Sequence, residues 1–159
     1  MTRHKLLPTP RPDSTVYRGT RLTGPAGQVW GVVVTVDGAD LDIAPSLALA
    51  CKSPTGFEWG YGGSGPGQLS LAILLDVTGD ADTAFDSFQW WKWCRVVNWG
   101  DWWEITAGEI RADLEQLRRE RDAMNAFDAA ASEVIDMNAE VVPVDMPFVV
   151  PPDAEGGGI

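Results

Sequence analysis

The residues best placed to bind a ligand form a glycine-rich stretch near the middle of the chain. Gly60, Gly62 and Gly65 have the G-x-G-x-x-G spacing of a dinucleotide-binding loop, between a strand-like and a helix-like segment. Unpaired N–H groups at the start of a helix, together with the helix dipole, can hold an anion without any special side chain. The candidate ligand-binding residues are therefore Gly62, Gly63, Ser64 and Gly65, completed by Lys52, Arg18 or Arg21.

Three departures separate this stretch from a dinucleotide enzyme. Pro66 follows the last glycine directly, no second strand ends in an acidic residue about 20 positions further on, and the next element reads as a helix. Pro66 also stands where a Walker loop needs lysine, and it replaces the second glycine of a nucleophile elbow around Ser64. The glycines can instead permit a tight turn under the rings of Trp59 and Tyr61, and we favour this structural role over ligand binding.

Tryptophan is the second unusual feature of the sequence. Six of the eight tryptophans lie between positions 90 and 103. At 100° per residue of a helix, Phe88 and Trp91 point one way and Trp90 and Trp93 nearly the opposite way, so one packed surface cannot cover all four. We expect at least two of the six rings to be open to solvent, where tryptophan favours a partner or self-association. The candidate partner-binding residues are Trp90, Trp93, Trp99, Trp102 and Trp103.

The few histidines and cysteines restrict catalysis and metal binding. Cys51 and Cys94 lie 43 residues apart without a CxxC motif, so we expect buried free thiols rather than a zinc site or a redox pair. The single histidine, His4, falls in a proline-rich leader, where it is poorly placed for a nucleophilic or zinc-dependent mechanism. We assign no catalytic residue, metal or cofactor. An enzyme would depend on carboxylates, Tyr, Lys or backbone amides.

The charge of the chain argues against nucleic acid as a partner. Asp and Glu total 23 against 12 Lys and Arg, and the resulting net charge of -11 repels a phosphate backbone. Seven acids and no base fall in residues 125–159, which is typical of a solubilising tail. The sequence has no apolar run of the length needed for a membrane span or a signal peptide, so we expect a cytoplasmic protein.

Short strands are expected to form the sheet that positions these residues. The predicted strands are residues 16–18, 28–36, 41–43 and 57–59, with turns at 23–27 and at Asp37-Gly38. The Val-rich segment 28–36 barely alternates, which places it in the middle of an antiparallel meander, and Pro45 ends the pairing. The leader before Thr15 alternates proline with polar residues and reads as an extended arm.

Two helices are expected to follow the glycine-rich stretch. The first should begin at Pro66, with Ser64 or Gly65 as its cap, and should end at Gly79. It is apolar almost all round, so we expect it to be buried against the sheet. The second should cover residues 83–97 with an aspartate cap at position 80 or 82, and a turn or strand should carry the tryptophans at 99–103.

The third helix has the clearest start signal. Thr106 and Glu109 have the spacing of a capping box, and apolar residues at helical spacing continue to Met124. Beyond this point the composition changes, and we expect only a short helix around Val134 and Ile135 before a proline- and glycine-containing end.

One block of the sequence resembles a known family. Residues 53–74, SPTGFEWGYGGSGPGQLSLAIL, with Tyr17-Arg18-Gly19 and residues 34–38, resemble the core of a small domain-of-unknown-function family found in bacteria, plasmids and phages. The resemblance is specific in this block and looser over residues 15–115. It implies a small α+β domain often carried on mobile DNA. It brings no established activity and no catalytic residues.

These observations together predict an α+β fold, in which a small, mostly antiparallel sheet packs against two or three helices. We expect an extended basic leader over residues 1–14, one domain over 15–124 and an acidic tail over 125–159. The favoured function is a non-enzymatic binding or inhibitory module of a phage- or plasmid-like accessory protein, which engages a host or defence-system protein through its tryptophan-rich surface. The alternative is binding or sequestration of a small anionic ligand, such as a nucleotide, at the glycine-rich stretch. Self-association stays open, and no membrane association is expected.

Overall fold

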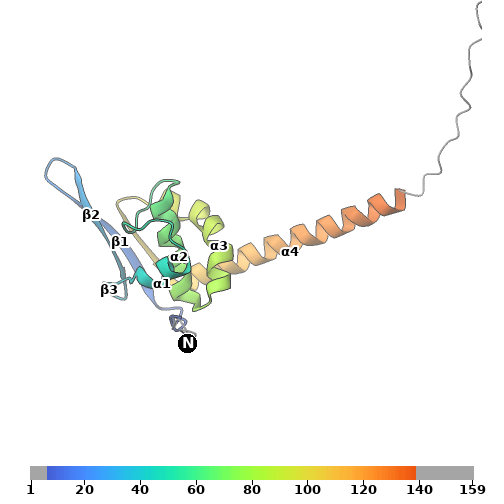
Figure 1. Ribbon diagram of the computed structural model, residues 1–159, viewed down its shortest axis with the longest axis horizontal. Helices are drawn as coiled ribbons and strands as arrows, with labels where there is room; N and C mark the ends of the chain where they lie inside the picture. The colour runs from blue at the N-terminus through green and yellow to red at the C-terminus, as the bar shows by residue number, and fades with distance from the viewer. Residues whose placement is uncertain (1–6, 139–159) are drawn as a thin grey trace, which may run out of the picture. The chain divides into compact units, whose positions relative to one another are not determined.

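A four-stranded antiparallel sheet carries the helices on one of its faces (Figure 1). The computed structural model describes residues 7–138, with side chains up to residue 132. The chain divides into two units after Arg121, and everything described below as a site lies in the first unit. The predicted α+β class is confirmed. None of the described helices is long and apolar enough to cross a membrane.

The sheet has the strand order β3-β2-β1-β4. Its strands are β1 (Val16–Thr23), β2 (Val29–Val36), β3 (Ala39–Asp40) and β4 (Trp102–Thr106). The predicted turn at Asp37-Gly38 joins β2 to β3, and both residues have positive φ, which suits a tight hairpin. As predicted, β2 lies inside the sheet, although its partner β3 is only two residues long.

Two predicted strands are wrong. Residues 41–43 pair with no strand in a regular ladder, and a short helix that the sequence analysis missed, α1 (Ala44–Leu49), follows immediately with Pro45 in its first turn. Residues 57–59 form a loop, because the Trp59 ring is drawn into the core and its Nε1 donates to the Gly100 carbonyl oxygen at 2.6 Å.

Helix α2 (Ser64–Thr78) is the centre of the core. It begins two residues before the predicted start, and its N-cap is Gly63, which offers no side chain to the first turn. The predicted end is confirmed, because Gly79 adopts the left-handed conformation and donates to the Leu75 carbonyl oxygen at 2.9 Å. Leu71, Ile73 and Leu74 are all fully buried, as expected for a helix without a polar face.

Helix α3 (Ala81–Cys94) is shorter than predicted at its C-terminal end, where a single 3-10 turn, η1 (Val96–Asn98), takes over. The predicted cap is confirmed, since the Asp80 carboxylate accepts from the Asp82 N–H at 3.0 Å. Cys94 and Cys51 are both exposed free thiols, which corrects the expectation of buried ones. The face of α3 that enters the core already carries larger rings, Phe88 and Trp91.

Helix α4 (Ala107–Asn138) begins at the predicted capping box. Thr106 N–H donates to the Glu109 carboxylate at 2.8 Å, and Glu109 N–H donates to the Thr106 hydroxyl at 3.2 Å. The predicted end near Met124 is wrong, because one continuous helix includes the segment where a separate short helix was expected. Residues 125–138 contain neither glycine nor proline and are rich in alanine, so nothing local interrupts the helix. The leader histidine His4 and the tail beyond Asn138 lie outside the described residues.

The described part of the leader is attached to the helices. Arg11 forms two hydrogen bonds with the Asp76 carboxylate of α2, at 2.9 and 3.1 Å. Arg111 of α4 contacts Asp13 and the carbonyl oxygens of Arg11 and Val77. Arginine contacts therefore attach the described part of the leader to α2 and α4, and it ends in a turn at Asp13 and Ser14.

Candidate functional site

The glycines of the predicted ligand site allow close packing of aromatic rings. A Cβ atom at Gly62 would lie 2.6 Å from the Trp93 ring, and one at Gly63 would lie 2.2 Å from the Tyr61 ring. At Gly65 a Cβ would meet the Cβ of Glu58 at 2.6 Å and the Tyr61 hydroxyl at 3.2 Å. These positions need glycine because neighbouring side chains fill the space, which agrees with the structural role favoured for them above.

The basic residues predicted to complete the site are engaged elsewhere. Arg18 forms an ion pair with Glu104 on the other face of the sheet. The Lys52 ammonium lies over the Phe85 and Phe88 rings, 5.6 and 5.2 Å from their centroids. Arg18 is therefore directed to the outer face of the sheet, and the Lys52 ammonium is placed over two aromatic rings, so the structure does not show either cation converging on the glycines.

Arg21, the third basic residue predicted for this site, and Lys92, which was not predicted, lie closer to the glycine-rich stretch but do not make an anion site. Arg21 donates to the Glu58 carboxylate and to the Trp59 carbonyl oxygen, both at 2.7 Å. The Lys92 ammonium lies 3.5 Å from the Gly62 carbonyl oxygen. This contact uses a carbonyl acceptor of the loop and not one of the N–H groups that would bind an anion. Arg21 is paired with the Glu58 carboxylate, so its charge is already balanced and does not favour an added anion.

Half of the tryptophans form a continuous aromatic cluster inside the fold. Trp99 stacks on Trp103 with ring centroids 4.0 Å apart, and it meets Trp91 edge to face at 5.7 Å. Trp59 meets Trp103 edge to face at 5.6 Å. These four rings, Trp59, Trp91, Trp99 and Trp103, connect the glycine-rich loop, α3 and β4 and form part of the core.

Trp103 is buried and corrects one of the partner-binding assignments. It is 4% exposed, because it lies on the core face of β4 and its ring fills the space beside Gly19 of β1. The period-two alternation of a strand places its neighbour Trp102 on the opposite face. The adjacent pair Trp102-Trp103 in the sequence already carries this signal, because neighbours in a strand face opposite sides. Trp90 and Trp99 are half-buried against the core, so neither presents a free ring.

Trp93 and Trp102 are the exposed members of the predicted set, at 58% and 60%. The prediction that at least two of the six rings are open to solvent is confirmed. Trp93 rests on Gly62 at the end of α3, and Trp102 projects from the outer face of β4. A third exposed ring, Trp30 at 68%, was missed because it sits in a Val-rich segment that was read as a buried strand.

Uncharged residues on the outer face of the sheet, three of the four apolar, form a contiguous patch around Trp102. Thr20 of β1 pairs with both Trp102 of β4 and Val33 of β2, so the three side chains form one row across the sheet. Leu22 is the next residue on that face, at 48% exposure. We call Thr20, Leu22, Val33 and Trp102 the outer-face patch. A row of polar residues borders it, formed by Glu104, Arg18, Thr35 and Asp40.

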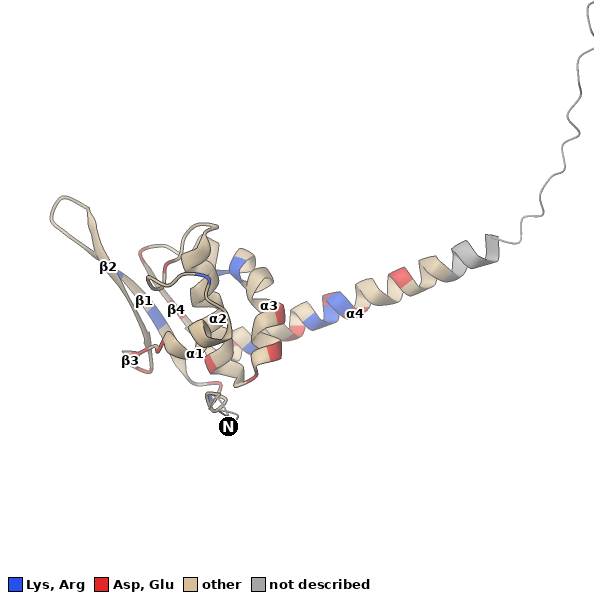
Figure 2. Ribbon diagram, viewed as in Figure 1, with Lys and Arg blue, Asp and Glu red and all other residues tan. Residues whose placement is uncertain are grey.

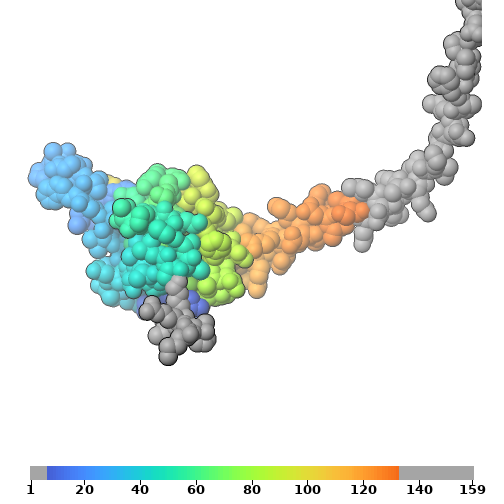
Figure 3. Space-filling view, in the orientation of Figure 1, coloured from blue at the N-terminus to red at the C-terminus, as the bar shows by residue number. Residues whose placement is uncertain are grey.

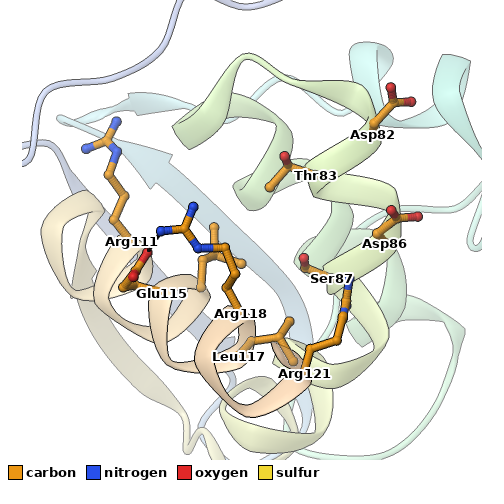
Figure 4. Close-up of a pocket in the computed structure, with 10 residues that line it drawn as sticks. Asp82, Thr83, Asp86, Ser87, Arg111, Glu115, Leu117, Arg118 and Arg121 are labelled. Carbon is orange, nitrogen blue, oxygen red and sulfur yellow. Dashed lines mark ion pairs between the residues drawn. The ribbon is translucent and has the colours of Figure 1, made fainter. Parts of the chain in front are cut away.

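A separate cavity of about 440 Å³ lies between α3 and α4 (Figure 4). Three arginines, Arg111, Arg118 and Arg121, line it together with Asp82, Asp86 and Glu115. Arg118 and Glu115 pair across 2.8 Å within the cavity wall. Its charges balance, and it contains none of the predicted site residues, so it favours neither an anion nor a cation.

Comparison with known proteins assigns a family to most of this fold. Residues 17–116 match the model of the Family of unknown function (DUF6166). No curated protein and no solved structure matches the chain at the level of significance applied. The matched range covers the sheet, α1 to α3 and the first turns of α4, and therefore includes both the glycine-rich stretch and the outer-face patch.

Proposed function

The chain belongs to this family of unknown function, and we propose that it is a non-enzymatic protein-binding module whose partner docks on the outer-face patch. The observation that carries the proposal is the exposure of Trp102, a ring 60% open in a domain that packs four other tryptophans together. In the phage- or plasmid-like setting that the sequence resemblance implies, the partner is a host or defence-system protein.

The surroundings of Trp102 support a protein partner. Interface hot spots are enriched in tryptophan, and they lie in apolar patches bordered by polar residues. Val33 and Leu22 supply apolar surroundings, and the exposed Arg18–Glu104 ion pair lies in the polar border. A small anionic ligand is the less favoured alternative, because Arg18 and Lys52 do not converge on the glycines.

The exposure of the rings can be tested before any partner is identified. Trp93 and Trp102 should each contribute fluorescence that acrylamide quenches, whereas the buried cluster should not. Single replacement of Trp102 by phenylalanine should remove a quenchable component. If the Trp102→Phe chain instead lost only emission that acrylamide does not quench, Trp102 would not be an exposed ring.

The docking proposal is tested with Trp102→Ala, using Trp93→Ala as the matched control. Both rings are similarly exposed, but Trp93 lies at the end of α3 rather than on the sheet. For a partner captured from lysate and then purified, calorimetry should show that Trp102→Ala weakens binding by about 30-fold or more, as expected for a hot spot, with little change in Tm. Equal binding by Trp102→Ala and the wild-type chain would refute docking on the outer-face patch.

A further inference from the structure

The two edges of the sheet differ in how they are protected. At one edge, β4 is five residues long and carries Glu104, and charged residues on edge strands discourage pairing with another chain. At the other edge, β3 covers only Thr35 and Val36 of β2. On the side of β2 that lies away from β1, residues 29–33 therefore have no neighbouring strand in the described part of the chain.

The hydrogen-bond pattern shows which backbone groups are available at this edge. Leu41 N–H donates to the Val34 carbonyl oxygen at 2.9 Å, so the polar groups of Val34 point away from β1. Because these directions alternate along an antiparallel strand, the N–H and C=O of Val32 point the same way. A β-bulge also leaves Trp30 without a partner on β1. This edge can therefore accept another strand.

The charge distribution favours a second copy of this chain as that strand. Residues 22–36 contain no charged residue, although the chain carries 35 charged residues and a net charge of -11. Figure 2 shows this stretch in tan, with neither blue nor red, at the end of the β1–β2 hairpin. Two acidic copies repel one another over most of their surface, and an uncharged strand edge is where they can approach with the least repulsion.

An exposed ring lies at the end of the hairpin, and a groove lies along the free side of β2. One side of the Trp30 ring rests against Gly24, and the residue remains 68% exposed. A groove of about 510 Å³ lies alongside, lined by Val32, Val34, Leu41, Ile43 and Phe57 among others. In Figure 3 the tip of this hairpin stands clear of the helices of its own domain. In a two-fold dimer both copies present the same surface, so the Trp30 ring of each copy can enter the groove of the other.

We propose that two copies associate through their β2 edges, antiparallel about a two-fold axis at Gly31. In this register Gly31 faces Gly31 of the second copy, Val32 faces Trp30, and Val33 faces Val29. Trp30 then lies beside Val32 at the groove wall. No heavy atom lies within 4 Å of a Cβ built on Gly31, so the face of the sheet has room for a side chain at this position. This contact shares only Val33 with the outer-face patch, and Trp102 lies on β4 at the opposite edge of the sheet.

The size of the contact is compatible with a dimer. Trp30 is 68% exposed, so burial of the two rings would cover about 200–340 Å² of the roughly 1,000 Å² that a specific interface needs. The exposed side chains of Val29 and Val33 and the paired backbones add to it. We therefore expect a reversible dimer.

Sedimentation of the full chain between about 1 and about 100 µM tests the association. Val32→Pro removes an N–H that would face the second copy and leaves the hydrogen bonds to β1 in place. Trp30→Ala removes the ring. Each change should weaken the dimer by at least about tenfold, whereas Trp102→Ala, an equally large ring on the outer face, should not. A wild-type chain that stays monomeric throughout, or a dimer that survives both changes, overturns the proposal.

Cross-linking tests the register. In a chain with both natural cysteines replaced by serine, Gly31→Cys should form a disulfide-linked dimer on oxidation. The backbone N–H and C=O of Gly31 point toward β1, so the two Gly31 residues that face one another at the axis form a non-hydrogen-bonded pair. The Cα atoms of such a pair lie about 4.5 Å apart, which is within reach of a disulfide. Val33→Cys is the matched control, because its two copies would lie about 13 Å apart. Equal cross-linking of both variants would refute this register.

Discussion

The hydroxyl of Tyr17 on β1 donates a 2.7 Å hydrogen bond to the carboxylate of Asp76 on α2, joining the sheet to the central helix inside the core. Burial, followed by this hydrogen bond, raises the pKa of Tyr17 well above its usual range, so the tyrosine stays protonated. Arg11 completes the arrangement by pairing with the same carboxylate.

Asp76→Ala should be among the most destabilising single changes in the domain. It leaves the Tyr17 hydroxyl buried without an acceptor and frees the leader at Arg11, so we expect a loss of about 3–5 kcal/mol of unfolding free energy. Tyr17→Phe removes one hydrogen bond and should cost about 0.5–1.5 kcal/mol. Urea denaturation of the two variants measures both. A loss for Asp76→Ala no larger than that for Tyr17→Phe would show that the arginine contact contributes little.

The capping box of α4 should make stability depend on acidic pH. Hydrogen bonds from the backbone N–H and then the hydroxyl of Thr106 lower the pKa of Glu109. A carboxyl group whose pKa is lower in the folded state stabilises the fold above its unfolded pKa of about 4.3 and loses that contribution as pH falls through the folded pKa. Denaturant melts at pH 7 and near pH 3 should therefore differ less for Glu109→Gln than for the wild-type chain. An unchanged difference would contradict this role.

Gly19→Ala should disturb the tryptophan cluster. Its Cβ would lie 2.2 Å from the Trp103 ring, which is held by its stack on Trp99, so we expect a loss of about 1–3 kcal/mol and a changed near-ultraviolet circular dichroism spectrum. Gly100→Ala is the control, because a Cβ at that position meets no heavy atom within 4 Å. Identical melting curves for the two variants would show that the Trp103 ring moves aside without cost.

A chain that ends at residue 124 should remain folded. The buried side chains of the described residues reach no further than Leu117, and the first unit ends at Arg121. Thermal melts of the shortened and full-length chains should agree to within a few degrees. A much earlier melt or aggregation of the shortened chain would show that the removed residues stabilise the domain.

Features that depend on a few neighbouring residues could be read from the sequence. The Thr106–Glu109 capping box, the Asp80 cap, the Gly79 end of α2 and the Asp37-Gly38 turn were all predicted correctly. Each needs only backbone and side-chain groups within about four residues of one another, so local spacing determines it. The α+β class and the burial of α2 followed from the same kind of pattern.

The position of each side chain relative to solvent depended on the tertiary structure. Trp102 and Trp103 are adjacent in the sequence, but the pairing of β4 with β1 exposes one and buries the other beside Gly19. Arg18 was expected at the glycines, yet that same pairing brings Glu104, 86 residues away, next to it. The composition showed that some tryptophans would be exposed. Only the strand register decided which ones, because that register fixes which face of each strand meets the core.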